Sequence, residues 1–239
     1  MLIINAGVFG LNKERKSYRM ELVKTADGSS TLYNAEVGEH YHSKHGALQE
    51  SKHVFLKSGL EFFLNNQPQD SVSILEIGFG TGLNYLLTAD YCLQHDISLN
   101  YIGIEKHPLS KEVIIQTGNI NYVSAVVAND FISNYDEAIK SQVNLGTGNL
   151  LIDVVDVKLY QSNIQADIIY FDAFAAVHQP EMWSEETLAH VCSFIKPRGV
   201  FVTYAITGNL KRTMKSLGFQ IEKVPGALGK REMLRAIKL

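Results

Sequence analysis

The first chemically suggestive feature is an acid followed by three glycines at alternate positions: Glu76, Gly78, Gly80 and Gly82 form the pattern Glu-x-Gly-x-Gly-x-Gly. Glycine adopts positive φ without strain and lets a ligand approach the backbone without meeting a Cβ atom. The pattern lies between an apolar run, 73–77, and a second apolar run typical of a helix. A buried strand, a glycine turn and the free N–H groups of a helix N-terminus form the nucleotide-binding βα unit. The pattern predicts a nucleotide-type cofactor, and the alternative is a glycine-rich turn without a ligand.

Further acids follow later apolar runs. Glu105 comes about 20 residues after the glycines, where a carboxylate in this type of fold accepts hydrogen bonds from both ribose hydroxyls. Asp172 follows the fourth run, and ligands of open α/β sheets bind at the carboxyl ends of the strands. Asp156 follows the third run, where Asp153 and Asp130 compete with it for a ligand contact. For Glu105 and Asp172 the alternative role is that of a helix or turn cap.

The elements that must position these acids alternate along the chain. Predicted strands lie at 73–77, 99–104, 150–155, 166–171 and 199–204. Predicted helices begin near Leu83, Leu109, Asn129 and Ser184. Such alternation predicts an α/β fold, with a parallel sheet and helices on both faces. After a helix at 208–217, two more strands, 219–224 and 232–237, predict a C-terminal antiparallel hairpin and a seven-stranded, mostly parallel sheet.

The segment before the glycines has a different character. Partly alternating runs at 18–25 and 30–37 flank an Asp-Gly turn signal and predict a β-hairpin. Apolar residues at helical intervals predict a helix at 47–64, with an interruption near Gly59. The predicted domains are an N-terminal extension and a main domain, at 1–70 and 71–239.

Three histidines, His40, His42 and His45, stand between the hairpin and the helix. They suggest either a metal site or a polar loop beside a binding cleft. No cysteine or carboxylate completes a known metal spacing, which favours the loop.

Composition is that of an ordinary globular protein. The 239 residues are 46% hydrophobic, enough for one sizeable core. No run is long and apolar enough for a membrane helix, and the start of the chain lacks the basic segment and cleavage site of a signal peptide. Cys92 and Cys192 match no metal or redox spacing, which predicts reduced thiols and a cytoplasmic protein.

The net charge of −3 conceals an uneven distribution. Residues 196–239 hold 10 Lys/Arg and 2 Asp/Glu, against 12 and 23 in the rest of the chain. A basic segment on an acidic protein predicts contact with a polyanion, and a set of solvated faces is the alternative. The cations predicted to bind phosphates are Lys211, Arg212, Lys215, Lys230 and Arg231.

Several motifs resemble known methyltransferases. The glycine pattern is similar to the first motif of class I S-adenosyl-L-methionine (SAM) methyltransferases, whereas the dinucleotide fingerprint requires glycine or alanine at the position of Leu83. From about Tyr33 to Ala236 the chain resembles the methyltransferase half of the bifunctional MnmC tRNA-modification enzymes. Besides the glycine pattern, the motifs that carry this resemblance are ESKHVFL at 50–56, DAFA at 172–175, PEMW at 180–183 and KREML at 230–234.

This resemblance implies SAM-dependent N-methylation of 5-aminomethyl-2-thiouridine at the tRNA wobble position, which gives 5-methylaminomethyl-2-thiouridine. It implies that Asp172 lies at the substrate amine and that Asp156 meets adenine. The residues implied to hold the cofactor are Glu76, Gly78, Gly80, Gly82, Asn84, Glu105, Asp156 and Asp172. Those expected to contact the substrate are Phe174, Trp183, Lys211, Arg212, Lys230 and Arg231. For Trp183, burial in the core is the alternative to stacking on a base.

The sequence departs from the family at two points. The family's DGFAP loop is DAFAA at 172–176, and the flavin oxidase domain of the bifunctional enzymes is absent from this sequence. The resemblance therefore implies a separate FAD-dependent oxidase, or another enzyme that generates the aminomethyl group, as a partner. Three other functions stay open: a methyltransferase for a small molecule or protein, an aminopropyltransferase, and a non-catalytic SAM- or tRNA-binding module.

Overall fold

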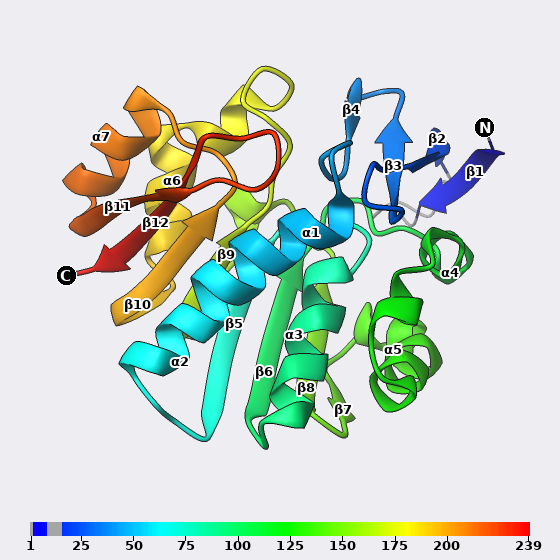
Figure 1. The fold of residues 1–239 in the computed structure, drawn as a ribbon, viewed down its shortest axis with the longest axis horizontal. Helices are drawn as coiled ribbons and strands as arrows, with labels where there is room; N and C mark the ends of the chain where they lie inside the picture. The colour runs from blue at the N-terminus through cyan, green and yellow to red at the C-terminus, as the bar shows by residue number, and fades with distance from the viewer. Residues whose placement is uncertain (1, 9–15) are drawn as a thin grey trace.

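The computed structural model describes residues 2–8 and 16–239. Its centre is a sheet of eight strands in the order β11-β12-β10-β9-β5-β6-β8-β7 (Figure 1). The parallel strands are β5 (Ser71–Ile77), β6 (Ser98–Ile104), β8 (Gly148–Asp153), β9 (Ala166–Phe171) and β10 (Ile195–Thr203). The antiparallel strands are β11 (Phe219–Pro225), β12 (Glu232–Lys238) and β7 (Val143–Leu145).

All seven predicted strands are present, and the predicted C-terminal hairpin is β11 and β12. The eighth strand, β7, was not predicted because it has only three residues, of which Val143 alone is buried. The third predicted strand ends at Asp153, two residues earlier than expected. This places Asp156 beyond the strand, in the loop that follows it.

Helices cover both faces of the sheet, because successive residues of a strand point to opposite faces. In β5, Ile74 packs into a cluster with η1, α3, α4 and α5, whereas Leu75 packs into a second cluster with α6 and α7. The helices are α1 (Ala47–Ser51), η1 (Lys52–Glu61), α2 (Phe62–Asn66), α3 (Leu83–Gln94), α4 (Lys111–Thr117), α5 (Ala125–Ala138), α6 (Glu185–Cys192) and α7 (Gly208–Ser216). Single turns of 3-10 helix are η2 (Asn119–Tyr122), η3 (Val157–Leu159) and η4 (Pro180–Trp183).

The predicted helix at 47–64 is a continuous run of α1, η1 and α2, in which η1 is wound as a π-helix. Gly59 lies inside η1 and does not interrupt the run. A Cβ atom at Gly59 would come within 2.9 Å of the Tyr170 ring and 3.1 Å of Val202, so glycine permits close packing of the helix on the sheet.

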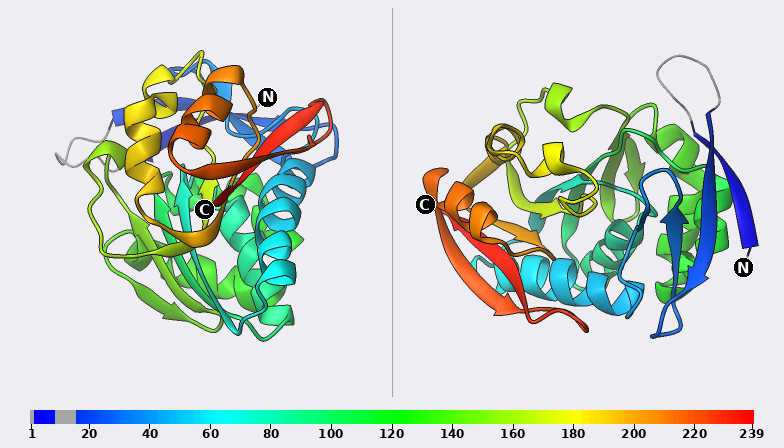
Figure 2. Two further views of the ribbon diagram at one scale, coloured as in Figure 1. Left: turned by 90° about the vertical axis from the view of Figure 1, so that its left-hand side faces the viewer. Right: turned by 90° about the horizontal axis from the view of Figure 1, so that it is seen from above.

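A second, antiparallel sheet lies beside the main one, in the order β1 (Leu2–Val8), β2 (Lys16–Lys24), β3 (Ser30–Asn34) and β4 (Glu39–His40) (Figure 2). The predicted hairpin is β2 and β3, with β3 shorter than expected because residues 35–38 form a turn. Met20 and Leu32 of this sheet belong to the same buried cluster as Ile74. The division at residue 70 remains a proposal.

Both cysteines, Cys92 and Cys192, are free, which agrees with the predicted reduced thiols, and both are buried. Within residues 2–8 and 16–239, no helix has the length and apolar character needed to cross a membrane.

Candidate active site

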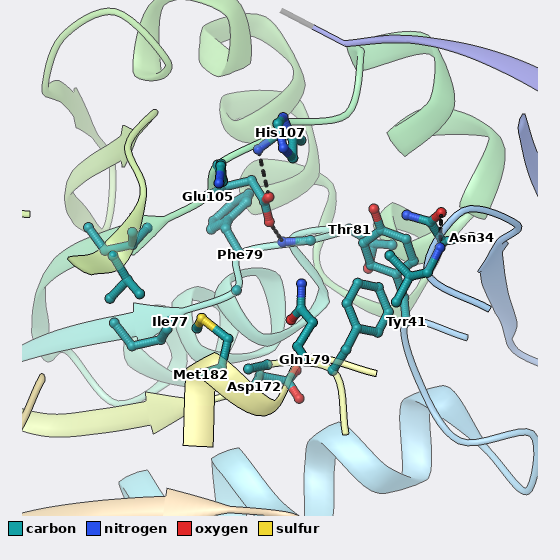
Figure 3. Close-up of a pocket in the computed structure, with 18 of the residues that line it drawn as sticks. Asn34, Tyr41, Ile77, Phe79, Thr81, Glu105, His107, Asp172, Gln179 and Met182 are labelled. Atoms are coloured by element: carbon teal, nitrogen blue, oxygen red, sulfur yellow. Dashed lines mark hydrogen bonds between the residues drawn. The ribbon is translucent and has the colours of Figure 1, made fainter. Parts of the chain in front are cut away.

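A cavity of about 410 Å³ opens at the carboxyl ends of β5, β6 and β9 (Figure 3). Its walls combine the glycine turn, the loops after β6 and β9, and residues of the N-terminal sheet. Ligands of open α/β folds bind at this edge, because the loops there can diverge around a crevice. Of the predicted site residues, those that line the cavity are Gly78, Gly80, Asn84, Glu105, Asp156, Asp172 and Phe174.

The glycine turn brings backbone to the cavity wall at two points. Gly78 has φ of 87°, and a Cβ atom there would lie 2.5 Å from the carbonyl oxygen of Asp172. Gly80 has φ of 52°, and its Cβ position is 3.0 Å from the Tyr41 ring. Gly82 lies outside the cavity lining: it is the left-handed N-cap of α3 and packs against Phe131. Gly82 therefore affects the direction in which α3 begins and does not contact the cavity directly.

Glu76 lies behind the cavity wall and does not line it. Its carboxylate is fully buried and accepts hydrogen bonds from Tyr101 Oη at 2.8 Å and from Asn84 Nδ2 at 2.8 Å. Burial raises the pKa of Glu76 well above its ordinary value, and the nearby charge of Asp172 adds to this rise. Glu76 therefore supports Asn84 from behind.

Asn84 links the buried acid Glu76 to the half-buried acid Asp172. Its Nδ2 atom also donates to Asp172 Oδ2 at 2.9 Å. Its Oδ1 atom is buried and has no hydrogen-bond partner among the residues that the structure describes. A buried polar atom without a partner is costly, so this oxygen is available to a donor on a ligand in the cavity.

Asp172 comes directly after β9, and its N–H donates to the carbonyl oxygen of Ile77 at the end of β5. Burial is the largest cause that raises the pKa of Asp172 to about 7, and the charge of Glu50 raises it further. The hydrogen bond from Asn84 and the charge of Lys230 oppose this rise. A carboxyl group in this range exchanges a proton near neutral pH.

Glu105 follows β6 and holds the glycine turn in place. Its Oε2 atom accepts a hydrogen bond from the Gly80 N–H at 3.0 Å, and its Oε1 atom accepts one from the His107 N–H at 2.9 Å (Figure 3). The carboxylate lines the cavity and retains further lone pairs, since each oxygen accepts more than one hydrogen bond.

Asp156 lines the cavity from the loop after β8, three residues beyond the end of that strand. It is the N-cap of η3, accepts from the Lys158 N–H at 3.0 Å, and pairs with Lys106 Nζ at 3.0 Å. Although burial acts to raise it, these hydrogen bonds hold the pKa of Asp156 below its ordinary value. Its two competitors, Asp153 and Asp130, lie outside the cavity lining.

The two predicted aromatic residues have different positions. Phe174 lines the cavity and meets the Tyr41 ring edge-on at 5.1 Å. Trp183 is outside the lining: its ring contacts Phe171 at 5.0 Å, and its Nε1 donates to the Phe174 carbonyl oxygen at 2.8 Å. Trp183 thus supports the loop that carries Phe174.

The predicted cations are divided among three places. Lys211, Arg212 and Lys215 lie on α7, outside the cavity lining. Lys230 points inward, where its Nζ lies 2.6 Å from Glu50 and 3.8 Å from the centre of the Tyr204 ring. Arg231 is exposed.

The sequence predicted a polar loop beside a binding cleft around the three histidines, and Tyr41 and His42 of this loop do line the cavity. The contribution of the preceding N-terminal sheet was not predicted. Residues of this region that line the cavity are Met20, Asn34, Glu36, Val37, Tyr41 and His42. Asn34 Oδ1 accepts the N–H groups of Glu36 and Val37 and so forms the turn at the cavity rim. For Asn34, Glu36 and Val37 the available signal was the resemblance that begins near Tyr33, because no local pattern connects these residues with the glycine turn.

The three histidines form no metal site with other described residues. Burial lowers the pKa of His42 to about 4, and its N–H donates to Thr31 Oγ1 at 3.0 Å. His42 is therefore a neutral residue of the cavity wall.

Comparison with known proteins decides the family. A family model described as S-adenosyl-L-methionine-dependent methyltransferase matches residues 120–239, half of the chain. The chain belongs to this family. The predicted enzyme class and the predicted cofactor are thereby confirmed.

Two curated relatives are bifunctional tRNA 5-methylaminomethyl-2-thiouridine biosynthesis proteins called MnmC. That of Methylobacillus flagellatus is 30% identical over 213 residues, which are 84% of this chain and 33% of the relative. That of Leptospira borgpetersenii is 32% identical over 204 residues, 81% of this chain and 31% of the relative. The methyltransferase described here spans about one third of the length of these relatives.

The structure of MnmC2 from Aquifex aeolicus matches with a TM-score of 0.73 at 22% identity, covering 94% of this chain and 71% of that one. This likeness confirms the predicted fold: a mixed sheet with a C-terminal antiparallel hairpin, preceded by an N-terminal hairpin.

The cavity of this methyltransferase fits its cofactor. SAM carries an ammonium, a sulfonium and an adenosine, so it requires hydrogen-bond acceptors and a close approach to backbone. The cavity offers the unpartnered Asn84 Oδ1, the Glu105 carboxylate and the bare backbone of Gly78, where a side chain would collide. Its volume is within the usual range for cofactor sites.

Proposed function

We propose that this methyltransferase methylates the amine of 5-aminomethyl-2-thiouridine at the wobble position of tRNA, giving 5-methylaminomethyl-2-thiouridine. The names of the MnmC relatives support the product. The observation that carries the proposal is the position of Asp172, a half-buried carboxylate at the carboxyl edge of the sheet whose pKa is about 7.

Asp172 is placed to accept the proton that an amine must lose. When bound, SAM supplies a methyl group on a sulfonium, which is already a good leaving group. An alkylamine is mostly protonated at neutral pH, so its lone pair becomes available only after a proton leaves. Asp172 accepts a hydrogen bond from the amine, orients its lone pair and takes this proton, while Asn84 fixes the carboxylate from the other side.

The charges around Asp172 favour a cationic or amine substrate. After burial, the charges of Glu50 and Glu39 raise the pKa of Asp172, whereas the hydrogen bond from Asn84 and the charge of Lys230 lower it. Glu39 is fixed by the N–H of Ala175, which donates to its Oε2 at 2.8 Å. More acids than bases thus surround the position, which suits an amine better than a carboxylate substrate.

At the other end of the cavity, Glu105 would hold the ribose hydroxyls and Asp156 the adenine amino group. Gly78 would admit the cofactor close to the backbone. The proposal also requires an enzyme that generates the aminomethyl group, either an FAD-dependent oxidase or another activity.

The test is methyl transfer from labelled SAM to tRNA from cells lacking this protein, followed by nucleoside analysis. We expect label in 5-methylaminomethyl-2-thiouridine. Asp172→Asn should lower the rate by roughly 10²- to 10⁴-fold while SAM affinity is unchanged. Label in a protein or small-molecule fraction instead would replace the tRNA substrate, and full activity of Asp172→Asn would remove its role as proton acceptor.

A further inference from the structure

Three side chains of α1 and η1 hold the end of β11 and the linker that follows it, residues 226–231. Gln49 Oε1 accepts the Leu228 N–H at 3.3 Å, Glu50 pairs with Lys230 at 2.6 Å, and His53 Nε2 contacts the Pro225 carbonyl oxygen at 2.7 Å. Two motifs that are far apart in sequence, ESKHVFL and KREML, therefore meet in one place. The cofactor site uses neither of them directly.

Exposed cations surround this contact. Lys52 and Lys57 are exposed on η1 and line one shallow depression together with His53. They are five residues apart, which places them on the same face because η1 is wound as a π-helix with i to i+5 hydrogen bonds. Arg231 is exposed at the base of the linker, where its carbonyl oxygen accepts the Gly226 N–H at 3.2 Å.

We call Lys52, Lys57 and Arg231 the clasp patch. None of the three forms an ion pair with a residue that the structure describes. The acid that lines the same depression as Lys52 and Lys57 is Asp27, whose carboxylate accepts hydrogen bonds from Gln49, Thr25 and Ser29. Its charge is therefore committed to the start of α1, and the clasp patch is open to an external anion.

The clasp patch is connected to the reaction centre by a short series of contacts. Lys230, next to Arg231, lies over the Tyr204 ring at 3.8 Å. Tyr204 Oη donates to the carbonyl oxygen of Ala173 at 2.9 Å, and Ala173 follows Asp172. The residue next to Arg231 is thus linked through two contacts to the residue next to Asp172.

We propose that the clasp patch binds the phosphate backbone of the RNA whose nucleoside enters the cavity. This inference rests on the proposed function. Three exposed cations that form no ion pair with a described residue match the repeating charge of a polynucleotide. The cations of α7, which the sequence grouped with Arg231, lie outside the cavity lining, as the clasp patch does. The clasp patch differs in that Arg231 adjoins Lys230, from which contacts lead to Tyr204 and Ala173.

The experiment compares two triple variants with equal loss of charge. The test variant is Lys52→Gln, Lys57→Gln and Arg231→Gln; the control is Lys211→Gln, Arg212→Gln and Lys215→Gln. Binding of fluorescent bulk tRNA is measured by anisotropy over a range of salt, with SAM affinity and thermal unfolding as checks on the fold. We expect the test variant to bind roughly tenfold or more weakly, with a salt slope reduced by about 1 for each phosphate that no longer pairs with a cation. The control should stay near the native protein.

Equal weakening of both variants, weakening of the control alone, or no tRNA binding by the native protein would overturn the inference. Loss of binding to anionic phospholipid vesicles, with unchanged tRNA binding, would assign the patch to a membrane instead. Methyl transfer separates this inference from the proposed function. If the test variant loses tRNA binding but the native protein leaves the wobble nucleoside unmethylated, the surface stands and the proposed reaction fails. If the native protein methylates that nucleoside and the test variant binds tRNA normally, the proposed reaction stands and the clasp patch is not the tRNA-binding surface.

Discussion

The carboxylate of Glu50 lies 2.6 Å from the ammonium of Lys230, although 180 residues separate the two in sequence. Only 7% of the Glu50 side chain and 32% of the Lys230 side chain are exposed. Both charges act on Asp172 in opposite directions: Glu50 raises the pKa of Asp172 and Lys230 lowers it. The pair therefore joins the N-terminal helix, the C-terminal linker and the reaction centre electrostatically.

Removing either charge should shift the pH dependence of methyl transfer in opposite directions. If Asp172 acts as a carboxylate, the rate rises with pH through its pKa of about 7. Lys230→Met removes a charge that lowers the pKa of Asp172, so the rise of the rate should move to higher pH. Glu50→Gln removes a charge that raises this pKa, so the rise should move to lower pH. Other groups that face Asp172 are Glu39, Glu76, Tyr101 and Tyr204, and both variants leave them in place. The measurement is kcat/KM against pH, and Lys230→Arg is the conservative control. Shifts of equal sign would contradict the electrostatic role.

Asp172 should destabilise the folded protein at alkaline pH. Its pKa rises from 3.8 to about 7 on folding, so between these values the native state binds more protons than the unfolded state. The free energy of unfolding should then fall as pH rises from about 4 to about 7, by up to roughly 4 kcal/mol from this group. Asp172→Asn should remove much of this decline and be more stable than the native protein at pH of about 8. Urea unfolding at acidic and alkaline pH measures the free energy of unfolding of the native protein and of Asp172→Asn. An equal decline with pH in the two proteins would contradict the prediction.

Glu105 should determine cofactor affinity. Its carboxylate fixes the glycine turn through Gly80 and faces the cavity, so Glu105→Gln should weaken SAM binding by about 10- to 100-fold. Asp153→Asn is the matched control, because Asp153 ends the adjacent strand β8 but lies outside the lining. Calorimetric titration of SAM distinguishes them. Similar losses in both variants would mean that the charge of the sheet edge, and not Glu105 itself, binds the cofactor.

Alanine substitution at two glycines with nearly equal φ distinguishes the cost of backbone strain from the cost of a steric clash of the new Cβ atom. Gly28 has φ of 83° and open space around its Cβ position, so Gly28→Ala should cost only the conformational penalty of about 1–2 kcal/mol. Gly78 has φ of 87°, but its Cβ would lie 2.5 Å from the Asp172 carbonyl oxygen. Gly78→Ala should cost more in free energy of unfolding and should abolish SAM binding. Equal effects would show that the close approach at Gly78 is unimportant.

The sequence by itself determined the strands, the glycine turn and the acids that follow the strands. These are local properties. A continuous apolar run indicates a strand that is buried on both faces, and the residue that follows a parallel strand lies at the carboxyl edge of the sheet. Glu105 and Asp172 were placed correctly at the carboxyl edge for this reason. The family motifs added the reaction class, which no spacing alone could supply.

Only the tertiary structure decided which side chains face the cavity. Glu76 points from β5 into the packing of α3, and Gly82 packs on Phe131, so neither lines the cavity despite belonging to the glycine motif. The structure also brought Tyr41 of the N-terminal segment over Gly80 and placed Lys230 on Glu50. Such contacts depend on how separate elements pack against one another. The residues that stabilise this packing are far apart in sequence, so no local sequence pattern predicts it.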